Sequence, residues 1–201
     1  MTQTFCIDKI NWQEAFPEKP EATVEVDNDH ERLFLTFRVK GEQLRAATAE
    51  DQGPVWEDSC VEFFCQVPGE KHYMNFETNC IGAMVASRRL GRAEEVRPLG
   101  EADMARISRR CLYRRAGEEW QTARRTAFEE RDGLFEWQVE LAIPLDLIFR
   151  DTMPLFPQTL RANFYKCADK TKKPHFLSWQ PIHLPNPDFH CPEFFGDLIL
   201  N

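Results

Sequence analysis

The sequence lacks the patterns that mark helical and membrane proteins. No segment sustains a hydrophobic repeat of helical period, and no apolar run is long enough to cross a bilayer. The first residues, MTQTFCIDKINW, contain neither the basic nor the apolar part of a secretory signal. We therefore expect neither a helical bundle nor a membrane partner.

Positive charge is also scarce. The chain has 25 lysine and arginine residues against 33 aspartate and glutamate residues, which gives a formal net charge of -8. A chain with this overall field repels the phosphates of nucleic acid. The charge balance argues against a nucleic acid partner and suits a neutral ligand better.

The cysteines form no CxxC pair and no regular spacing, so the common zinc and thioredoxin-like motifs are absent. An odd count, with several cysteines on predicted core faces, indicates free buried thiols. Such thiols favour a cytoplasmic location, but a removed leader would leave the same start, so the compartment stays open. The seven are Cys6, Cys60, Cys65, Cys80, Cys111, Cys167 and Cys191.

Aromatic residues and proline are plentiful instead. Phenylalanine occurs 16 times and proline 13 times, and short aromatic or β-branched runs alternate with turn residues. About ten such runs predict an all-β fold, a jelly-roll or immunoglobulin-like antiparallel β-sandwich. We expect residues 1–201 to form a single domain.

The clearest hairpin lies within residues 54–79. Apolar side chains alternate with period 2 on both sides of the turn Pro68-Gly69-Glu70-Lys71. Pairing Val67 with His72 across that turn places Phe64 opposite Asn75 and Glu62 opposite Glu77.

The polar face of this hairpin suggests a binding site. Two facing carboxylates destabilise a sheet unless a polyhydroxylated ligand or a cation lies between them. A different register, or an arginine from a neighbouring strand, would also explain Glu62 and Glu77. Trp56 favours the ligand, because it lies in a Gly-Pro loop where a large ring has no obvious buried destination.

Further strands are expected on both sides of this hairpin. Strands at 22–26 and 33–39 flank the acidic turn 27–31, which either binds calcium or forms a solvated Asx-type turn, the second being favoured. A second hairpin is predicted at 119–143, with Arg131-Asp132-Gly133 as its turn.

Near the C-terminus, residues 160–167 are predicted to pair with residues 195–200. The intervening stretch 174–196 is rich in proline and aromatic residues and has no period. A loop of this length is functional or disordered, and its aromatic content argues against disorder. The arginine-rich segment 88–115 is expected to be the solvated face of strands.

The motifs VWEDSCVEFF, YMNFETN, NFYKC, PHFLSWQPI and FHCPEFFG resemble the family-9-type carbohydrate-binding modules, specifically the stand-alone family-9-like relatives. The resemblance runs nearly end to end. It implies a sandwich that holds a mono- or disaccharide between two tryptophans, association with glycoside hydrolases in polysaccharide catabolism, and structural calcium in some members. No other cofactor is expected.

Position by position, the resemblance implies that Trp56 and Trp179 stack on the sugar, and that Glu62 and Asn75 bind its hydroxyls. An arginine that the family places two residues before this amide is Tyr73 here. The pairing of strands adds Glu77 to the same polar face, since hydroxyls in the plane of a sugar ring need donors and acceptors. The predicted ligand-binding residues are thus Trp56, Glu62, Tyr73, Asn75, Glu77 and Trp179.

Three other functions remain open at this point. Glu62 and Glu77 are spaced for a retaining glycoside hydrolase, although both approach a sugar from the same side. Met74 with one of His72, His175, His183 or His190 would suit a haem module. The aromatic loop would suit a protein-interaction module.

Overall fold

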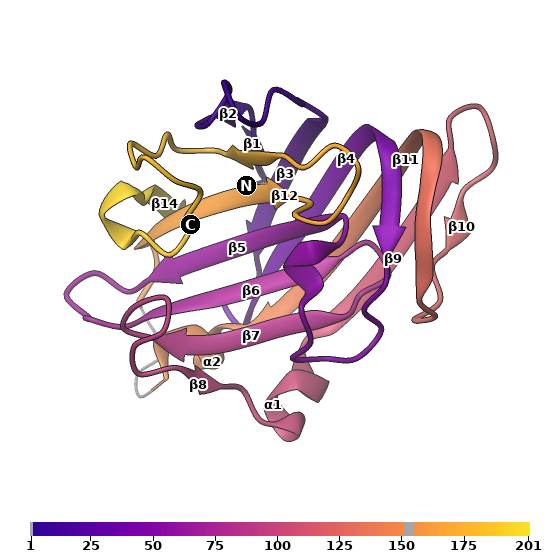
Figure 1. Cartoon of the computed structure of the whole chain (residues 1–201). Helices are drawn as coiled ribbons and strands as arrows, with labels where there is room; N and C mark the ends of the chain where they lie inside the picture. The colour runs from indigo at the N-terminus through magenta and orange to yellow at the C-terminus, as the bar shows by residue number, and fades with distance from the viewer. Residues whose placement is uncertain (1, 151–154) are drawn as a thin grey trace.

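In a computed structural model of the chain, two antiparallel β-sheets pack face to face (Figure 1). The structure describes residues 2–150 and 155–201. The first sheet has six strands in the order β1 (Gln3–Cys6), β3 (Glu21–Asn28), β4 (Arg32–Ala46), β11 (Phe128–Pro144), β9 (Ser108–Arg115) and β10 (Gln121–Thr122). The predicted all-β sandwich is confirmed.

The second sheet has eight strands. Their order is β2 (Lys9–Ile10), β13 (Phe176–Ser178), β12 (Gln158–Cys167), β5 (Cys60–Gln66), β6 (Tyr73–Asn79), β7 (Met84–Arg89) and β8 (Arg97–Pro98), with β14 (Gly196–Leu200) also paired to β12. The pairing of β12 with β14 confirms the predicted contact between residues 160–167 and the C-terminal strand.

Helical segments are short. They are α1 (Glu101–Arg106), α2 (Leu145–Phe149) and the 3₁₀ turns η1 (Val55–Glu57) and η2 (Pro192–Phe194). Pro144 precedes α2, because its fixed φ suits the start of a helix. Within the described residues, no helix has the length and apolar character that a bilayer span requires.

The main core lies between the sheets and follows from strand alternation. Leu33, Leu35, Phe37 and Val39 of β4 point inward and are at most 4% exposed. From the second sheet, the ring of Phe63 stacks on those of Phe76 and Phe164. Trp137 of β11 is also fully buried.

The predicted hairpin at 119–143 is wrong. Residues 128–144 form one long strand, β11, which passes through Arg131-Asp132-Gly133 and pairs with β4 on one side and β9 on the other. The register shifts between Phe128 and Arg131 and again between Asp132 and Phe135, and Gly133, within the second shift, has a φ of 129°. The glycine therefore permits a bulge-like irregularity within a strand. The same Asp-Gly sequence is typical of hairpin turns, which explains the wrong prediction.

The acidic turn at 27–31 forms the Asx-type alternative. Oδ1 of Asp29 accepts hydrogen bonds from the backbone N–H groups of Glu31 at 3.0 Å and Arg32 at 2.7 Å. In the described part of the chain, the one cluster of metal-ligating side chains lies elsewhere. The carboxylates of this turn are not gathered to fit the calcium ion that the resemblance implies in some members.

The solvated strand face predicted for the arginine-rich segment 88–115 is confirmed in β9 but is wrong for Arg89 of β7, which is buried. Arg110 pairs with Glu140, and Arg114 pairs with Glu136, in both cases across the strand boundary to β11. Arg109 instead reaches Asp51 in the loop after β4. These contacts occupy the guanidinium groups, so the run is a solvated, ion-paired sheet face.

Both faces of the second sheet are covered. Its outer face carries a second apolar cluster beneath the proline-rich loop that follows β13. The ring of Tyr165 stacks on Phe189 with centroids 4.1 Å apart, and the indole N–H of Trp12 donates to the carbonyl of Leu184 at 2.8 Å. The long loop is thus fixed by packing, as its aromatic content predicted.

One buried carboxylate fixes the loop that leads into β5. Asp58 has no exposed surface and accepts hydrogen bonds from the N–H groups of Ala47 and Thr48 and from the amide of Asn79. It also pairs with the guanidinium of Arg45. These bonds join β4, β6 and η1, so they hold the turn that carries Trp56.

We expect Asp58→Asn to lower the free energy of unfolding by about 3 kcal/mol, because an amide would leave Arg45 without its counter-charge. This corresponds to a fall of roughly 6–12 °C in melting temperature for a chain of this size. Asp197→Asn, at a surface ion pair, is the control and should change little. A melting temperature for Asp58→Asn within 2 °C of the original protein would contradict the assignment.

Candidate ligand-binding site

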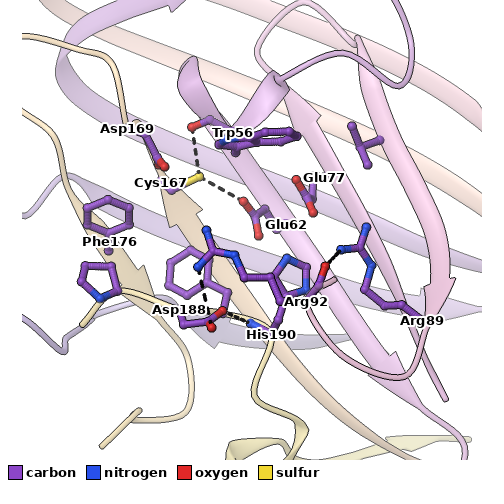
Figure 2. A pocket seen from close by; sticks show the side chains of 13 residues that line it. Trp56, Glu62, Glu77, Arg89, Arg92, Cys167, Asp169, Phe176, Asp188 and His190 are labelled. Atoms are coloured by element: carbon purple, nitrogen blue, oxygen red, sulfur yellow. Dashed lines mark hydrogen bonds and ion pairs between the residues drawn. The ribbon is translucent and has the colours of Figure 1, made fainter. Parts of the chain in front are cut away.

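A cavity of about 280 Å³ lies on the outer face of the second sheet (Figure 2). Its floor comes from β5 and β6, and its walls come from η1, the end of β7 and the proline-rich loop. The volume lies at the lower end of the range of small-molecule sites. The lining residues are Trp56, Glu62, Glu77, Val85, Arg89, Arg92, Cys167, Asp169, Phe176, Pro187, Asp188, Phe189 and His190.

Two facing carboxyl groups form the floor. Glu62 of β5 and Glu77 of β6 are directly opposite each other, which confirms the predicted register. They are only 3% and 4% exposed. Glu62 accepts a hydrogen bond from the thiol of Cys167 at 3.0 Å, and Glu77 accepts one from the amide of Asn75 at 2.8 Å.

Burial changes the protonation of this pair. Loss of solvation holds the pKa of Glu62 well above its usual range, and the neighbouring Cys167 and Glu77 raise it further. Burial also raises the pKa of Glu77 to about 7, against the opposing effect of Arg89. Both floor carboxyls therefore keep their protons to higher pH than exposed carboxyls do, and Glu77 ionises near neutral pH.

A chain of hydrogen bonds supports Glu77 from below. The guanidinium of Arg89 donates to the hydroxyl of Ser87 at 2.6 and 3.0 Å, and this hydroxyl donates to the amide oxygen of Asn75 at 2.6 Å. The amide nitrogen of Asn75 then donates to Glu77. Asn75 is fully buried, so it orients the carboxyl beneath the cavity.

The walls combine one exposed ring with a charged group. Trp56 is 39% exposed, as expected for a ring without a buried destination. In Figure 2 the two carboxyls lie between Trp56 and the group formed by Arg92, Asp188 and His190. Arg92 pairs with Asp188 at 3.7 Å, and Asp188 accepts the backbone N–H of His190 at 2.9 Å.

Tyr73 supports this wall from behind. It is 1% exposed and packs against Phe64 and Phe195 in the second apolar cluster. Its hydroxyl lies 2.9 Å from Nδ1 of His190. Tyr73 thus orients His190, which lines the cavity.

Trp179 does not face Trp56 across the cavity. Its ring packs against Phe5 at 4.7 Å and Phe164 at 5.6 Å, on the side of the sheet that faces the other sheet. The reason is the alternation of β13, which places Phe176 outward and Leu177 inward. The aromatic ring that this strand supplies to the cavity is therefore Phe176.

Several lining residues were not predicted from the sequence. Arg92, Asp169, Asp188 and His190 come from loops without a period. Arg89 was within reach of prediction, since it lies directly opposite Tyr73 in the pairing of β6 with β7. Its guanidinium lines the cavity and donates to the hydroxyl of Ser87.

The haem alternative is not assembled in the structure. Met74 is buried in the core between the sheets, on the face opposite the cavity. Each candidate histidine contacts another residue: His72 contacts Glu95, His175 contacts Lys166, His183 contacts Phe194 and His190 contacts Tyr73.

Two packed antiparallel sheets with a polar, aromatic-lined cavity on one outer face define a ligand-binding β-sandwich. The chain belongs to carbohydrate-binding family 9, whose model matches residues 2–200. Its function is accordingly carbohydrate binding as a module of this family. No protein of curated function matches the sequence.

Solved structures agree with this assignment. A protein from Bacteroides uniformis, described as a candidate carbohydrate-binding protein, is 34% identical, with a TM-score of 0.86 over 99% of this chain and 86% of its own. Family 9 modules from Caldicellulosiruptor kristjanssonii in complex with glucose and with cellotriose are 12% and 10% identical, and both have a TM-score of 0.58. They cover 92% and 99% of this chain and 78% and 82% of their own, and they show the shared fold.

The two tryptophans should differ in their effect on stability. We expect Trp179→Ala to cost about 2–4 kcal/mol of unfolding free energy, because it opens a cavity beside Phe5 and Phe164. Trp56→Ala should cost less than about 1 kcal/mol, since its ring is largely outside the core. Urea unfolding of both variants tests this. Equal losses would show that Trp56 is a core residue or that Trp179 is not.

The raised pKa of Glu77 makes stability depend on pH. The folded state holds this proton up to about pH 7 and the unfolded chain only to about 4.5, so the contribution is complete below pH 4.5 and is lost as pH rises through 7. In chelator-treated protein, Glu77→Gln should remove this loss. Between pH 5 and pH 8, the melting temperature of the original protein should fall by roughly 2–8 °C more than that of Glu77→Gln. This corresponds to about 1–2 kcal/mol of unfolding free energy.

Glu129→Gln, at an exposed carboxyl of β11 in the other sheet, is the control. The same pH dependence in Glu77→Gln and in the original protein would show that Glu77 does not titrate with a raised pKa.

Proposed function

We propose that the cavity binds a mono- or short oligosaccharide without cleaving it. The observation that carries this proposal is the exposed ring of Trp56 beside the buried carboxyl pair Glu62 and Glu77. In the proposed complex the apolar face of a pyranose covers the indole ring of Trp56. The sugar hydroxyls then reach the two carboxyls and the polar wall.

The chemistry of a sugar suits these groups. A pyranose has a C–H face that buries apolar area against an aromatic ring, and its hydroxyls both donate and accept hydrogen bonds. Carboxyls with raised pKa values offer both kinds of partner, since the protonated form donates and the ionised form accepts. Phe176 takes the place that a second tryptophan was expected to fill.

The relatives suggest which sugars to test first. Family 9 modules of the same fold have been solved with glucose and with cellotriose. We propose glucose and short glucose oligomers as the ligand class. A disaccharide of roughly 23 heavy atoms at about 0.3 kcal/mol per atom would gain near 7 kcal/mol, so the Kd should be on the order of 10 μM.

Binding without cleavage fits the position of the carboxyls. Both project from neighbouring strands of one sheet face, so they reach a bound sugar from the same side. A glycoside hydrolase needs an acid at the leaving oxygen and a nucleophile or base on the other face of the ring. We propose a role in polysaccharide catabolism beside a separate glycoside hydrolase, which would supply the cleavage.

We expect Trp56→Ala to weaken binding of the best saccharide at least tenfold, because the stacking surface is lost. Isothermal titration calorimetry across a panel from glucose to cellotriose measures this. The matched control is Trp120→Ala, since Trp120 is 42% exposed but packs beside Arg114 away from the cavity. Unchanged affinity in Trp56→Ala, or equal loss in both variants, would contradict the proposal.

A further inference from the structure

We propose that Cys60, Cys167 and Glu62 bind a thiophilic divalent cation, of which Zn²⁺ is the type, at the edge of the cavity floor. The site shares Glu62 with the saccharide site proposed above. The metal site needs no sugar to form, so each proposal can be tested independently of the other.

Strand pairing brings the three side chains together. Cys60 begins β5 and lies directly opposite Cys167, which ends β12. Glu62 is two residues further along β5, and side chains two residues apart share one face of a strand. The three side chains therefore project from the same corner of the sheet, and Figure 2 shows Cys167 and Glu62 pointing toward each other.

The ligand atoms are close enough to share an ion. The two Sγ atoms and a carboxyl oxygen of Glu62 all lie within 4.8 Å of one another. Atoms bound to one tetrahedral zinc ion at about 2.0–2.3 Å lie roughly 3.3–3.8 Å apart, about 1 Å closer than this limit. Small side-chain rotations thus suffice. Within residues 2–150 and 155–201, no other group of three cysteine, histidine or acidic side chains meets this spacing.

The donor set selects the class of metal. Two sulfur ligands favour zinc and similar soft or borderline cations, whereas calcium and magnesium take oxygen ligands. Binding converts both thiols to thiolates and Glu62 to a carboxylate and releases their protons to solvent. The resulting set carries three negative charges against two positive. The buried amine of Lys166, 2.6 Å from the carbonyl of Cys167, lies nearby to offset the excess.

The site would be open on one side. Three protein ligands leave one position of a tetrahedral zinc ion free, as in sites that exchange a bound molecule. Cys167 and Glu62 both line the cavity, whereas Cys60, which is as buried as Cys167, does not. The free position therefore faces the cavity, where a water molecule or a sugar hydroxyl takes it.

Cobalt(II) binding tests the proposal on the full chain, reduced with a phosphine and stripped with a chelator. One equivalent of Co²⁺ should give thiolate-to-cobalt charge-transfer absorption and strong visible bands of tetrahedral cobalt. Added Zn²⁺ should displace the cobalt and abolish both features. Competition with a chromophoric chelator should show zinc affinity reduced at least 100-fold in Cys60→Ser and Cys167→Ser, and about tenfold in Glu62→Gln.

Cys65→Ser is the matched control. Cys65 is a buried cysteine of the same strand β5, but it packs in the core between the sheets, so this variant should keep the cobalt spectrum. The spectrum of the original protein needs no variant to fold. The proposal would be overturned if the original protein showed no charge-transfer bands, or if the bands persisted in Cys60→Ser and Cys167→Ser. It would also be overturned if Cys60 and Cys167 formed a disulfide and the protein bound no metal once that bond was reduced.

Saccharide titration of the same chelator-treated protein separates the two proposals. Binding that depends on Trp56 without a cobalt spectrum would remove only the metal site. A cobalt spectrum without saccharide binding would keep the metal site and remove the proposed function.

Discussion

Two carboxyl groups face each other on neighbouring strands in a place that water scarcely reaches, and the rest of the site is arranged around this pair. If both were ionised, like charges would meet across one strand spacing in a medium of low dielectric constant. The fold disfavours this state by raising the pKa of Glu62, and it places Asn75 and Arg89 near Glu77. A sheet that needed only stability would carry apolar side chains at these positions.

The low dielectric itself results from covering both faces of one sheet. The inner face packs against the other sheet, and the outer face packs against the proline-rich loop through Tyr165 and Phe189. Prolines fix the path of this loop and the aromatic rings anchor it, so it has a defined surface without regular hydrogen bonding. The loop thereby sets the walls of the cavity, including Asp188 and His190.

The features that could be predicted from the sequence are those that follow from the alternation of apolar and polar residues along a strand. The turn Pro68-Gly69-Glu70-Lys71 and two alternating strands were enough to predict that Glu62 faces Glu77 and Phe64 faces Asn75. The inward face of β4 followed from the same rule. These features depend on neighbours in sequence and on the twofold repeat of a strand, so a single chain contains the information.

The errors arose where a local signal has two structural meanings or where contacts are distant. Asp132-Gly133 marks a turn in many chains, but here the strand continues because β4 and β9 both pair with it. Trp179 follows a three-residue strand that is too short to show a period, and its direction is set by pairing with β12. The cavity walls required knowing how a loop near the C-terminus folds over β5 and β6, which no periodicity records.

Glu62 shows why a buried polar position can serve two kinds of ligand. Oε1 of Glu62 accepts a hydrogen bond from the thiol of Cys167, and the carboxyl also lines the cavity (Figure 2). A thiol is a weak donor, and its bond to a protonated carboxyl adds little. A cation between the two sulfurs and this oxygen would replace that weak contact with strong bonds and would favour the ionised carboxylate. The sugar would then meet an acceptor at Glu62 where the metal-free cavity offers a donor.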